Sequence, residues 1–435
     1  MVSARAGALH ALVEFEKGHT ERLRDALDEA KLVGREHAFA FELAHGVLRR
    51  ERLLDHVLEG FAHRGLPKDV PLRCTLRLGA YQLLFVAGMP AHAAVHETVE
   101  LVRANKGFAN AMLRQLSASI ESRAADPARP TEELPLSPTR VLLLQKPLPD
   151  GELDRLALVH SLPFFLMQRW EKRIGRDVLR QVAEAASTVP EVFLRIGAGL
   201  DRDAVRADLA AAEVVCDPAE HPRMLRWSSG NSPFGTRAFR DGHFVVQDPT
   251  ALAAAEAVPC SPGDTVVDLC AAPGTKTMAL AERVRPGGTV WAFDPAPERR
   301  ARIVENVARL KLGEVVRIAA AAAELPVADA VLADVPCSNT GVLGRRVEVR
   351  RRLTAGGFSR LVAVQKELLA QAMGLCKPGG AVVYSTCSID REENEAVVEA
   401  VLAAAGPGRW QLQQSHLSLP KAGVCDGGFF AVLRG

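Results

Sequence analysis

Two features common in membrane and secreted proteins are missing from this 435-residue sequence. No hydrophobic run is long enough to span a bilayer, although 48% of the residues are hydrophobic. Charged residues and histidines interrupt the amino-terminal segment early, so it lacks the apolar core of a signal peptide. The sequence therefore predicts a soluble cytoplasmic protein with no membrane partner.

Paired cysteine motifs are missing as well. The eight cysteines stand at positions 74, 216, 260, 270, 337, 376, 387 and 425, and none forms C-x-x-C. This spacing argues against a zinc site, any other metal site or a disulfide framework. Free thiols are typical of a reducing compartment.

The chain also lacks a strong net charge, which is only +2, so composition alone does not indicate nucleic-acid binding. Basic residues are concentrated locally instead, in one arginine cluster made of Arg345, Arg346, Arg350, Arg351 and Arg352. Phosphate contact is the functional interpretation of this cluster, and a solvated helix face is the alternative. No heptad pattern demands an oligomer, which favours a monomer.

The most informative stretch is TVVDLCAAPGTKT, residues 265–277. Its pattern predicts a short buried strand, a tight turn of small residues and a helix, which is the first unit of a doubly wound α/β fold. The stretch is neither a P-loop nor a dinucleotide motif, because it contains only Gly274. A nucleoside cofactor without phosphates, such as S-adenosylmethionine, fits better, although an ordinary strand–helix turn fits these residues equally well.

Polar residues follow three further predicted strands. Asp294 follows residues 289–293 and is placed to accept hydrogen bonds from ribose hydroxyls. Residues 330–333 precede Asp334 and Cys337, and residues 381–385 precede Cys387. Because the carboxyl ends of the first, fourth and fifth strands are neighbours in such a sheet, Asp268 and these residues should converge on one crevice.

Together, DLCAAPGTKT, DVPCSNTGV and YSTCS resemble the RNA cytosine-5 methyltransferases of the RsmB (Sun) type. The resemblance implies bound S-adenosylmethionine and a cytosine in RNA. It implies that Cys387 attacks the base and that Cys337 assists product release. It places Asp334 between cofactor and base, with Lys276 reaching the base or Asp334, and Asp294 at the ribose. The methionine end of the cofactor would be held by Cys270, Ala271, Ala272, Pro273, Gly274, Thr275 and Lys276.

This chemistry explains the need for two cysteines. A thiolate that adds to carbon 6 of cytosine makes carbon 5 nucleophilic enough to take a methyl group. A thiol with a pKa near ~8.5 is mostly protonated at neutral pH, so the attacking cysteine needs activation. Asp390 and Glu393 predict a capping box, so that the positive end of a helix would face Cys387. The alternative is that both thiols are small buried hydrophobes.

Three regions precede the catalytic residues. Residues 1–125 are helical in pattern, and FELAHGVLRRERLLDHVL and FANAMLRQL resemble NusB-like domains, which implies RNA binding and favours small-subunit ribosomal RNA. Residues 126–151 are rich in proline and predict a linker. Residues 152–240 predict a small α+β RNA-binding module, and residues 241–435 a Rossmann-like α/β methyltransferase domain. Within it, Asp248 is predicted to cap a helix, and the last strand, near 429–433, to lie at the sheet edge.

One departure from the family pattern affects the cofactor site. Where the family places an aspartate that contacts adenine, this chain has Ala319–Ala323, and the first acid is Glu324. The missing carboxylate should weaken cofactor binding by roughly 1–3 kcal/mol unless Glu324 or a backbone group replaces it. This departure supports one alternative, a non-catalytic RNA-binding or ribosome-assembly protein. A second alternative, the same chemistry on transfer RNA, also stays open.

Overall fold

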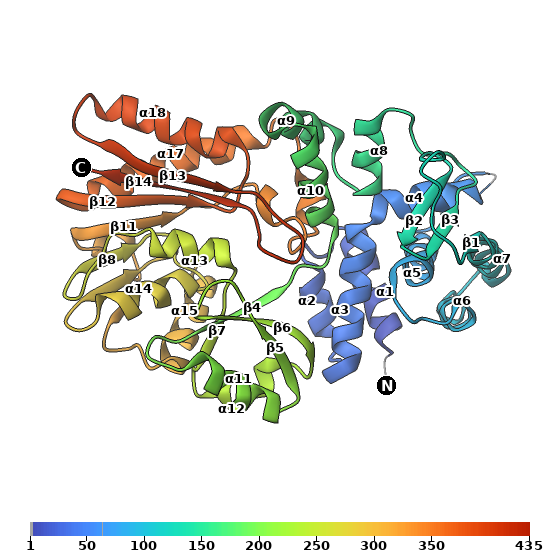
Figure 1. The fold of residues 1–435 in the computed structure, drawn as a ribbon, viewed down its shortest axis with the longest axis horizontal. Coiled ribbons are helices and arrows are strands. Elements are labelled where there is room, and N and C mark those ends of the chain that lie inside the picture. The colour runs from blue at the N-terminus through green and yellow to red at the C-terminus, as the bar shows by residue number, and fades with distance from the viewer. Residues whose placement is uncertain (1–2, 63) are drawn as a thin grey trace. The chain divides into compact units, whose positions relative to one another are not determined.

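The computed structural model describes residues 3–62 and 64–435, which form two compact units (Figure 1). One unit contains Met1–Val189 together with the short segment Arg346–Arg352. The other contains Pro190–Arg345 and Leu353–Gly435. Within the described residues, no helix has the length and apolar character needed to cross a membrane.

The first unit begins with a bundle of helices whose apolar faces share one core. Asp69 accepts a hydrogen bond from the backbone N–H of Leu72 and so caps the central helix α5, in which most residues are buried. This part confirms the predicted helical character of the amino-terminal region. The helices are α1 (Ala4–Glu16), α2 (Leu23–Glu29), α3 (Gly34–Arg49), α4 (Glu51–Gly60), α5 (Val70–Phe85), α6 (Ala91–Glu100) and α7 (Lys106–Ala118).

The segment predicted as a proline-rich linker is folded in the structure. Strands β2 (Glu133–Ser137) and β3 (Arg140–Leu143) pair in antiparallel fashion, and β1 (Ile120–Glu121) completes a three-stranded sheet of order β1-β3-β2. Pro135 is accommodated because β2 is an edge strand. Leu134 and Leu142 are buried in the helical core, so apolar packing outweighs the proline content.

The first unit then continues beyond the predicted boundary at residue 151. Helices α8 (Glu152–Val159), α9 (Phe164–Ile174) and α10 (Arg176–Ser187) belong to it, and so does the short α16 (Val349–Arg352). The small module is correspondingly shorter at its start than the predicted 152–240. Its four-stranded sheet has the order β5-β6-β4-β7, and its last strand lies beyond residue 240. The elements are β4 (Val192–Ile196), α11 (Arg202–Ala211), β5 (Val214–Pro218), β6 (Met224–Gly230), α12 (Arg237–Arg240) and β7 (Phe244–Val246).

A seven-stranded mixed sheet of order β10-β9-β8-β11-β12-β14-β13 forms the core of the second unit. Its strands are β8 (Thr265–Asp268), β9 (Thr289–Ala292), β10 (Val316–Ile318), β11 (Ala328–Asp334), β12 (Cys376–Thr386), β13 (Gln411–Ser418) and β14 (Gly428–Arg434). Two hydrophobic clusters cover its two faces, one with α13 (Pro249–Glu256), α14 (Thr275–Val284) and α15 (Pro297–Arg309), the other with α17 (Phe358–Gly374) and α18 (Glu395–Ala405) (Figure 1). The predicted doubly wound α/β fold is confirmed.

The pairing register brings the functional strand ends together. Strand β11 lies between β8 and β12, with Leu332 opposite Asp268 and Asp334 opposite Ser385. Strand β14 pairs antiparallel with β12 on one side and with β13 on the other. The prediction that the last strand lies at the sheet edge is therefore wrong, because β13 occupies that edge.

Candidate active site

Two cysteine thiols meet at the carboxyl edge of the sheet. The Sγ atoms of Cys337 and Cys387 are 3.1 Å apart, although 50 residues separate them in the chain. Asn339 joins them: its side-chain amide donates to the carbonyl oxygen of Cys337 at 2.8 Å, and its Oδ1 accepts from the Cys387 thiol at 3.3 Å. Cys337 is buried and Cys387 partly exposed, so only Cys387 is open to a substrate.

The hydrogen bond between the thiols distinguishes them chemically. The pKa of the Cys337 thiol is raised well above its ordinary value by its hydrogen bond to Cys387, by burial and by the nearby charges of Cys387 and Glu393. Cys337 therefore stays a neutral thiol that can donate a hydrogen bond to the Cys387 sulfur. Once Cys387 gives up its proton, the protonated Cys337 can donate a hydrogen bond to the Cys387 sulfur.

An ion pair lies beside the thiols. The Nζ of Lys276 donates to Asp334 Oδ2 at 2.6 Å. Burial acts to lower the pKa of Lys276, but the charge and hydrogen bond of Asp334 and the nearness of Cys387 raise it above its ordinary value. Lys276 thus holds a positive charge close to the Cys387 sulfur, where it would stabilise a thiolate.

The small-residue turn after β8 is tightly held. Ala271 donates its backbone N–H to the Phe293 carbonyl at 2.8 Å, and Gly274 donates to the Ala271 carbonyl at 2.7 Å. Gly274 has a φ of 100°, which favours glycine, and it precedes the first residue of α14, Thr275. Pro273 lies in this turn, and its backbone carbonyl oxygen accepts a hydrogen bond from the side-chain amide of Asn306 at 3.1 Å.

Buried carboxylates flank the turn and fit a cationic nucleoside cofactor. Asp268 is buried, its Oδ2 accepts from Thr277 at 2.7 Å, and its Oδ1 has no hydrogen-bond partner. Burial raises the pKa of Asp268 to about 7 and that of the neighbouring Cys270 thiol as well. An unpaired carboxylate oxygen in such a site is expected to have a donor when the ligand is bound, and S-adenosylmethionine carries an ammonium group and ribose hydroxyls.

Asp294 follows β9, as predicted, and it is fully buried. Its carboxylate accepts from the backbone N–H groups of Ala272 at 3.3 Å and Ala296 at 3.1 Å, so it connects the turn with the start of α15. Arg299 lies 3.3 Å from the same carboxylate. Asp294 therefore orders the cofactor loop besides its predicted contact with ribose.

Replacing Asp294 with alanine should weaken the binding of S-adenosylmethionine by about 1–3 kcal/mol, on the order of tenfold to a hundredfold. The variant loses the predicted acceptor for the ribose and the two hydrogen bonds from the backbone N–H groups of Ala272 and Ala296. Isothermal titration calorimetry with the full chain measures the change. Glu298→Gln, at an exposed acid in the first turn of α15, is the matched control, and equal affinities of the two variants would contradict the role of Asp294.

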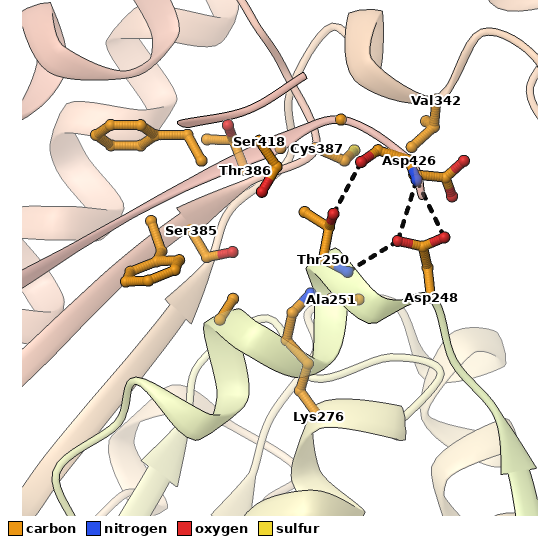
Figure 2. Close-up of a pocket in the computed structure, with 15 residues that line it drawn as sticks. Asp248, Thr250, Ala251, Lys276, Val342, Ser385, Thr386, Cys387, Ser418 and Asp426 are labelled. Atoms are coloured by element: carbon orange, nitrogen blue, oxygen red, sulfur yellow. Dashed lines mark hydrogen bonds between the residues drawn. The ribbon is translucent and has the colours of Figure 1, made fainter. Parts of the chain in front are cut away.

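A pocket opens beside Cys387, between α13 and the turn that precedes β14 (Figure 2). Thr250 donates its hydroxyl to the Asp426 carbonyl at 2.8 Å, and Asp248 accepts from the backbone N–H groups of Thr250 and Asp426. Asp248 is therefore the N-cap of α13, as predicted, and the sequence reasoning missed its second contact. Lys276 also lines this pocket, so the pocket lies next to both reactive groups.

The predicted capping box beyond Cys387 is not formed. Asp390 accepts from the Thr340 hydroxyl at 2.7 Å, and Glu393 accepts from the backbone N–H of Ser338 at 2.8 Å. A short 3-10 helix, η4 (Arg391–Glu393), follows Cys387, and α18 begins only at Glu395. Neither acid makes the hydrogen bonds of a capping box, because each accepts instead from a hydroxyl or backbone N–H donor in the loop after β11.

The arginine cluster is largely engaged inside the protein. Arg345 pairs with Asp426 and Asp248, at 2.5 and 3.3 Å. Arg350 is buried and donates to the carbonyl oxygens of Arg49 and Ala186, and burial lowers its pKa to about 9. Arg351 pairs with Glu16 and Glu51.

The other two arginines of the cluster are more accessible. Arg352 lies 3.4 Å from Glu21, and Arg346 is exposed. RNA contact by the cluster stays a prediction, with Arg346 and Arg352 the most accessible members.

The alanine run leaves Glu324 in a local contact. Glu324 Oε2 accepts from the backbone N–H of Ala320 at 2.9 Å, while Ala319 is buried. The side chain of Glu324 thus returns to the segment where the family has its aspartate. Among residues 3–62 and 64–435, no group of three or more His, Cys, Asp or Glu side chains could hold a metal ion.

Comparisons with known proteins identify the family to which the chain belongs. A family model described as 16S rRNA methyltransferase RsmB/F matches residues 255–422, and the NusB family model matches residues 2–118. The probable ribosomal RNA small subunit methyltransferase B of Synechocystis sp. is 30% identical, with 100% of both chains covered. The ribosomal RNA small subunit methyltransferase B of Vibrio cholerae is also 30% identical, over 99% of this chain and 96% of its own.

Two solved structures share the fold. The crystal structure of PH0851 has a TM-score of 0.75 at 23% identity, covering 100% of this chain and 99% of that one. The structure of NSun6 from Pyrococcus horikoshii with SFG has a TM-score of 0.55 at 17% identity, covering 61% of this chain and 96% of that one.

The doubly wound sheet, the small-residue turn and the acids at the strand ends define an S-adenosylmethionine-dependent methyltransferase. Since relatives at 30% identity match along the whole chain, the protein belongs to the RsmB/F family of 16S rRNA methyltransferases, and it carries a NusB domain at its amino terminus.

Proposed function

We propose that this protein methylates carbon 5 of a cytosine in small-subunit (16S) ribosomal RNA through a covalent cysteine–cytosine intermediate. The observation that carries the proposal is the pair of thiols 3.1 Å apart, Cys337 and Cys387, beside the Lys276–Asp334 ion pair. The choice of RNA rests on the relatives, which are named small-subunit ribosomal RNA methyltransferases, and on the NusB domain.

The reaction needs a nucleophile and a group that helps it to leave. The Cys387 thiolate adds to carbon 6, and the electron density gained at carbon 5 allows that carbon to take a methyl group. Bound S-adenosylmethionine supplies the methyl group as an electrophile. Loss of the carbon 5 proton and expulsion of Cys387 then restore the ring. A neutral Cys337 thiol donates a hydrogen bond to the departing sulfur.

Asp334 completes the site for the base. Its carboxylate is held by Lys276 at 2.6 Å and lies at the end of β11, one residue before the segment that leads to Cys337. A carboxylate there can accept from the exocyclic amino group of cytosine, which favours addition of the thiolate. The same contact would discriminate against uracil, which has no amino group at that position.

Cys337→Ala protein should accumulate a covalent complex with RNA. Without the Cys337 thiol, addition and methyl transfer still occur but release of Cys387 is slowed. The full-length variant is incubated with labelled S-adenosylmethionine and 16S ribosomal RNA, and a labelled protein–RNA band is sought after denaturing electrophoresis.

Two controls make this experiment decisive. The double variant with Cys337→Ala and Cys387→Ala should give no complex, since it lacks the attacking thiol. Transfer RNA as substrate should give none with either variant. A complex that forms equally without Cys387, or a wild-type protein that methylates neither RNA, would contradict the proposal, and the second result would support a non-catalytic role.

A further inference from the structure

A buried carboxylate binds the residue that follows Cys337 in the chain. The side chain of Glu393 is fully buried, and its Oε1 accepts from the backbone N–H of Ser338 at 2.8 Å and from Gln365 Nε2 at 3.0 Å. Its Oε2 accepts from the Ser338 hydroxyl. All three partners can donate, which is what an ionised carboxylate requires.

These contacts fix the peptide groups on both sides of Cys337. Gln365 Nε2 donates to the Pro336 carbonyl at 3.0 Å as well as to Glu393. The carbonyl before the cysteine and the N–H after it are therefore both tied to the same pair of side chains. Rotation of the backbone at Cys337 would break several buried hydrogen bonds, each costly to leave unmade.

The charges around the two thiols are arranged unequally. The ammonium of Lys276 lies near Cys387, whereas the carboxylate of Glu393 lies near Cys337. Three other titratable groups lie in this part of the site: Asp334, which is paired with Lys276, Asp390, which accepts from the Thr340 hydroxyl, and Tyr384, whose hydroxyl donates to the backbone carbonyl of Glu393 at 2.5 Å. Burial raises the pKa of Tyr384, so this hydroxyl stays neutral. A negative charge on one side and a positive charge on the other favour a thiolate at Cys387 and a thiol at Cys337.

We infer that Glu393 is a positioning residue that keeps Cys337 in the neutral thiol form and so makes Cys387 the cysteine that attacks. This inference rests on the proposed covalent mechanism and adds a charged group that distinguishes two adjacent thiols, besides their mutual hydrogen bond and the burial of Cys337. Glu393 does not line the pocket beside Cys387. It acts through Cys337 by the charge of its carboxylate, which the hydrogen bonds from Ser338 and Gln365 hold in place.

The release step shows why the neutral form matters. The carbon 5 proton passes to water, its bonding electrons form the carbon 5–carbon 6 double bond, and the electrons of the carbon 6–sulfur bond return to Cys387 as a thiolate. A Cys337 thiol donates a hydrogen bond to that thiolate, whereas a Cys337 thiolate would repel it. The charge of Glu393 opposes the second state.

Glu393→Gln is the sharpest test, because it removes the charge while the amide can still meet each partner. Its oxygen can accept from Ser338 N–H and Gln365, and its NH₂ can donate to the Ser338 hydroxyl. Iodoacetamide labelling of the full chain from pH 6 to pH 10, read by peptide mass spectrometry, reports the two thiols separately. In the wild type, Cys387 should react at lower pH than Cys337. In Glu393→Gln, Cys337 should react about tenfold faster at a given pH, equivalent to a pKa lower by about one unit.

Ser338→Ala is the matched control, because it removes one hydrogen bond to Glu393 and keeps the carboxylate. Its labelling profile should follow the wild type. An unchanged profile in Glu393→Gln, or an equal shift in Ser338→Ala, overturns the inference even if Cys337→Ala still traps RNA. The opposite outcome is also possible: Cys337→Ala traps no RNA, but the labelling profile of Glu393→Gln is shifted. That result overturns the proposed function, while the control of the thiols by Glu393 still holds. The two failures are therefore distinguishable.

Discussion

Replacing Cys387 with alanine should lower the rate of methyl transfer to 16S ribosomal RNA by at least about a thousandfold. In the proposed mechanism, the variant lacks the sulfur that adds to carbon 6. Cys337 cannot replace it, because this thiol is buried and its pKa is raised well above the ordinary value. Single-turnover transfer of a labelled methyl group gives the rate. Calorimetry with S-adenosylmethionine should show nearly unchanged affinity, since the variant leaves the carboxylates Asp268 and Asp294 and the turn between β8 and α14 intact.

Cys376→Ala is the matched control for this prediction. Cys376 begins the same strand, β12, that ends just before Cys387, and it is also a partly buried free cysteine. Its thiol lies near the carbonyl oxygens of Asp329 and Ala381. Its replacement should leave the rate within a small factor of the wild type. A rate for Cys387→Ala within about tenfold of the control would contradict nucleophilic catalysis by Cys387.

The strand ends were predictable because their signals are local. Short apolar runs such as residues 265–267 end in a polar residue, and the rule for the order of strands in a doubly wound sheet then places β8, β11 and β12 side by side. The convergence of Cys337 and Cys387 followed from that order alone. The distance of 3.1 Å between their sulfur atoms and the hydrogen bonds through Asn339 could not be predicted from the strand order. This side-chain geometry depends on loops that the sequence pattern does not describe.

The features that the sequence did not reveal depend on distant partners. Arg350 donates to the carbonyl of a residue 301 positions away, so a cluster of arginines looked like a basic surface. Glu393 has the spacing of a capping box from Asp390, but it bonds Ser338, 55 positions earlier. Strand β13 is almost wholly exposed, and no alternation of apolar and polar residues indicates it in the sequence. Because β13 was not predicted, β14 was wrongly expected at the edge of the sheet.

A crossing of two loops holds the segment after Cys337 in place. Gly341 donates its N–H to the Cys387 carbonyl at 2.9 Å and accepts from the N–H of Gly427 at 2.8 Å. A Cβ atom at Gly341 would lie 2.5 Å from the Gly427 oxygen and 2.8 Å from the Cys387 oxygen. Both are backbone atoms, so they cannot move aside as a flexible side chain would. Glycine is required here for close approach rather than for an unusual φ.

Gly341→Ala should therefore lower the rate of methyl transfer by about a hundredfold, because a displacement of about 1 Å at reacting groups has an effect of that order. Overpacking should also lower the free energy of unfolding by about 1–3 kcal/mol. Gly313→Ala is the control, since a Cβ atom there meets nothing within 4 Å. Rates are compared at a temperature where circular dichroism shows both variants folded. If Gly341→Ala is destabilised but transfers methyl groups at the rate of Gly313→Ala, the crossing serves stability alone. If its rate falls as expected, the spacing of the two thiols depends on this glycine as much as on the cysteines themselves.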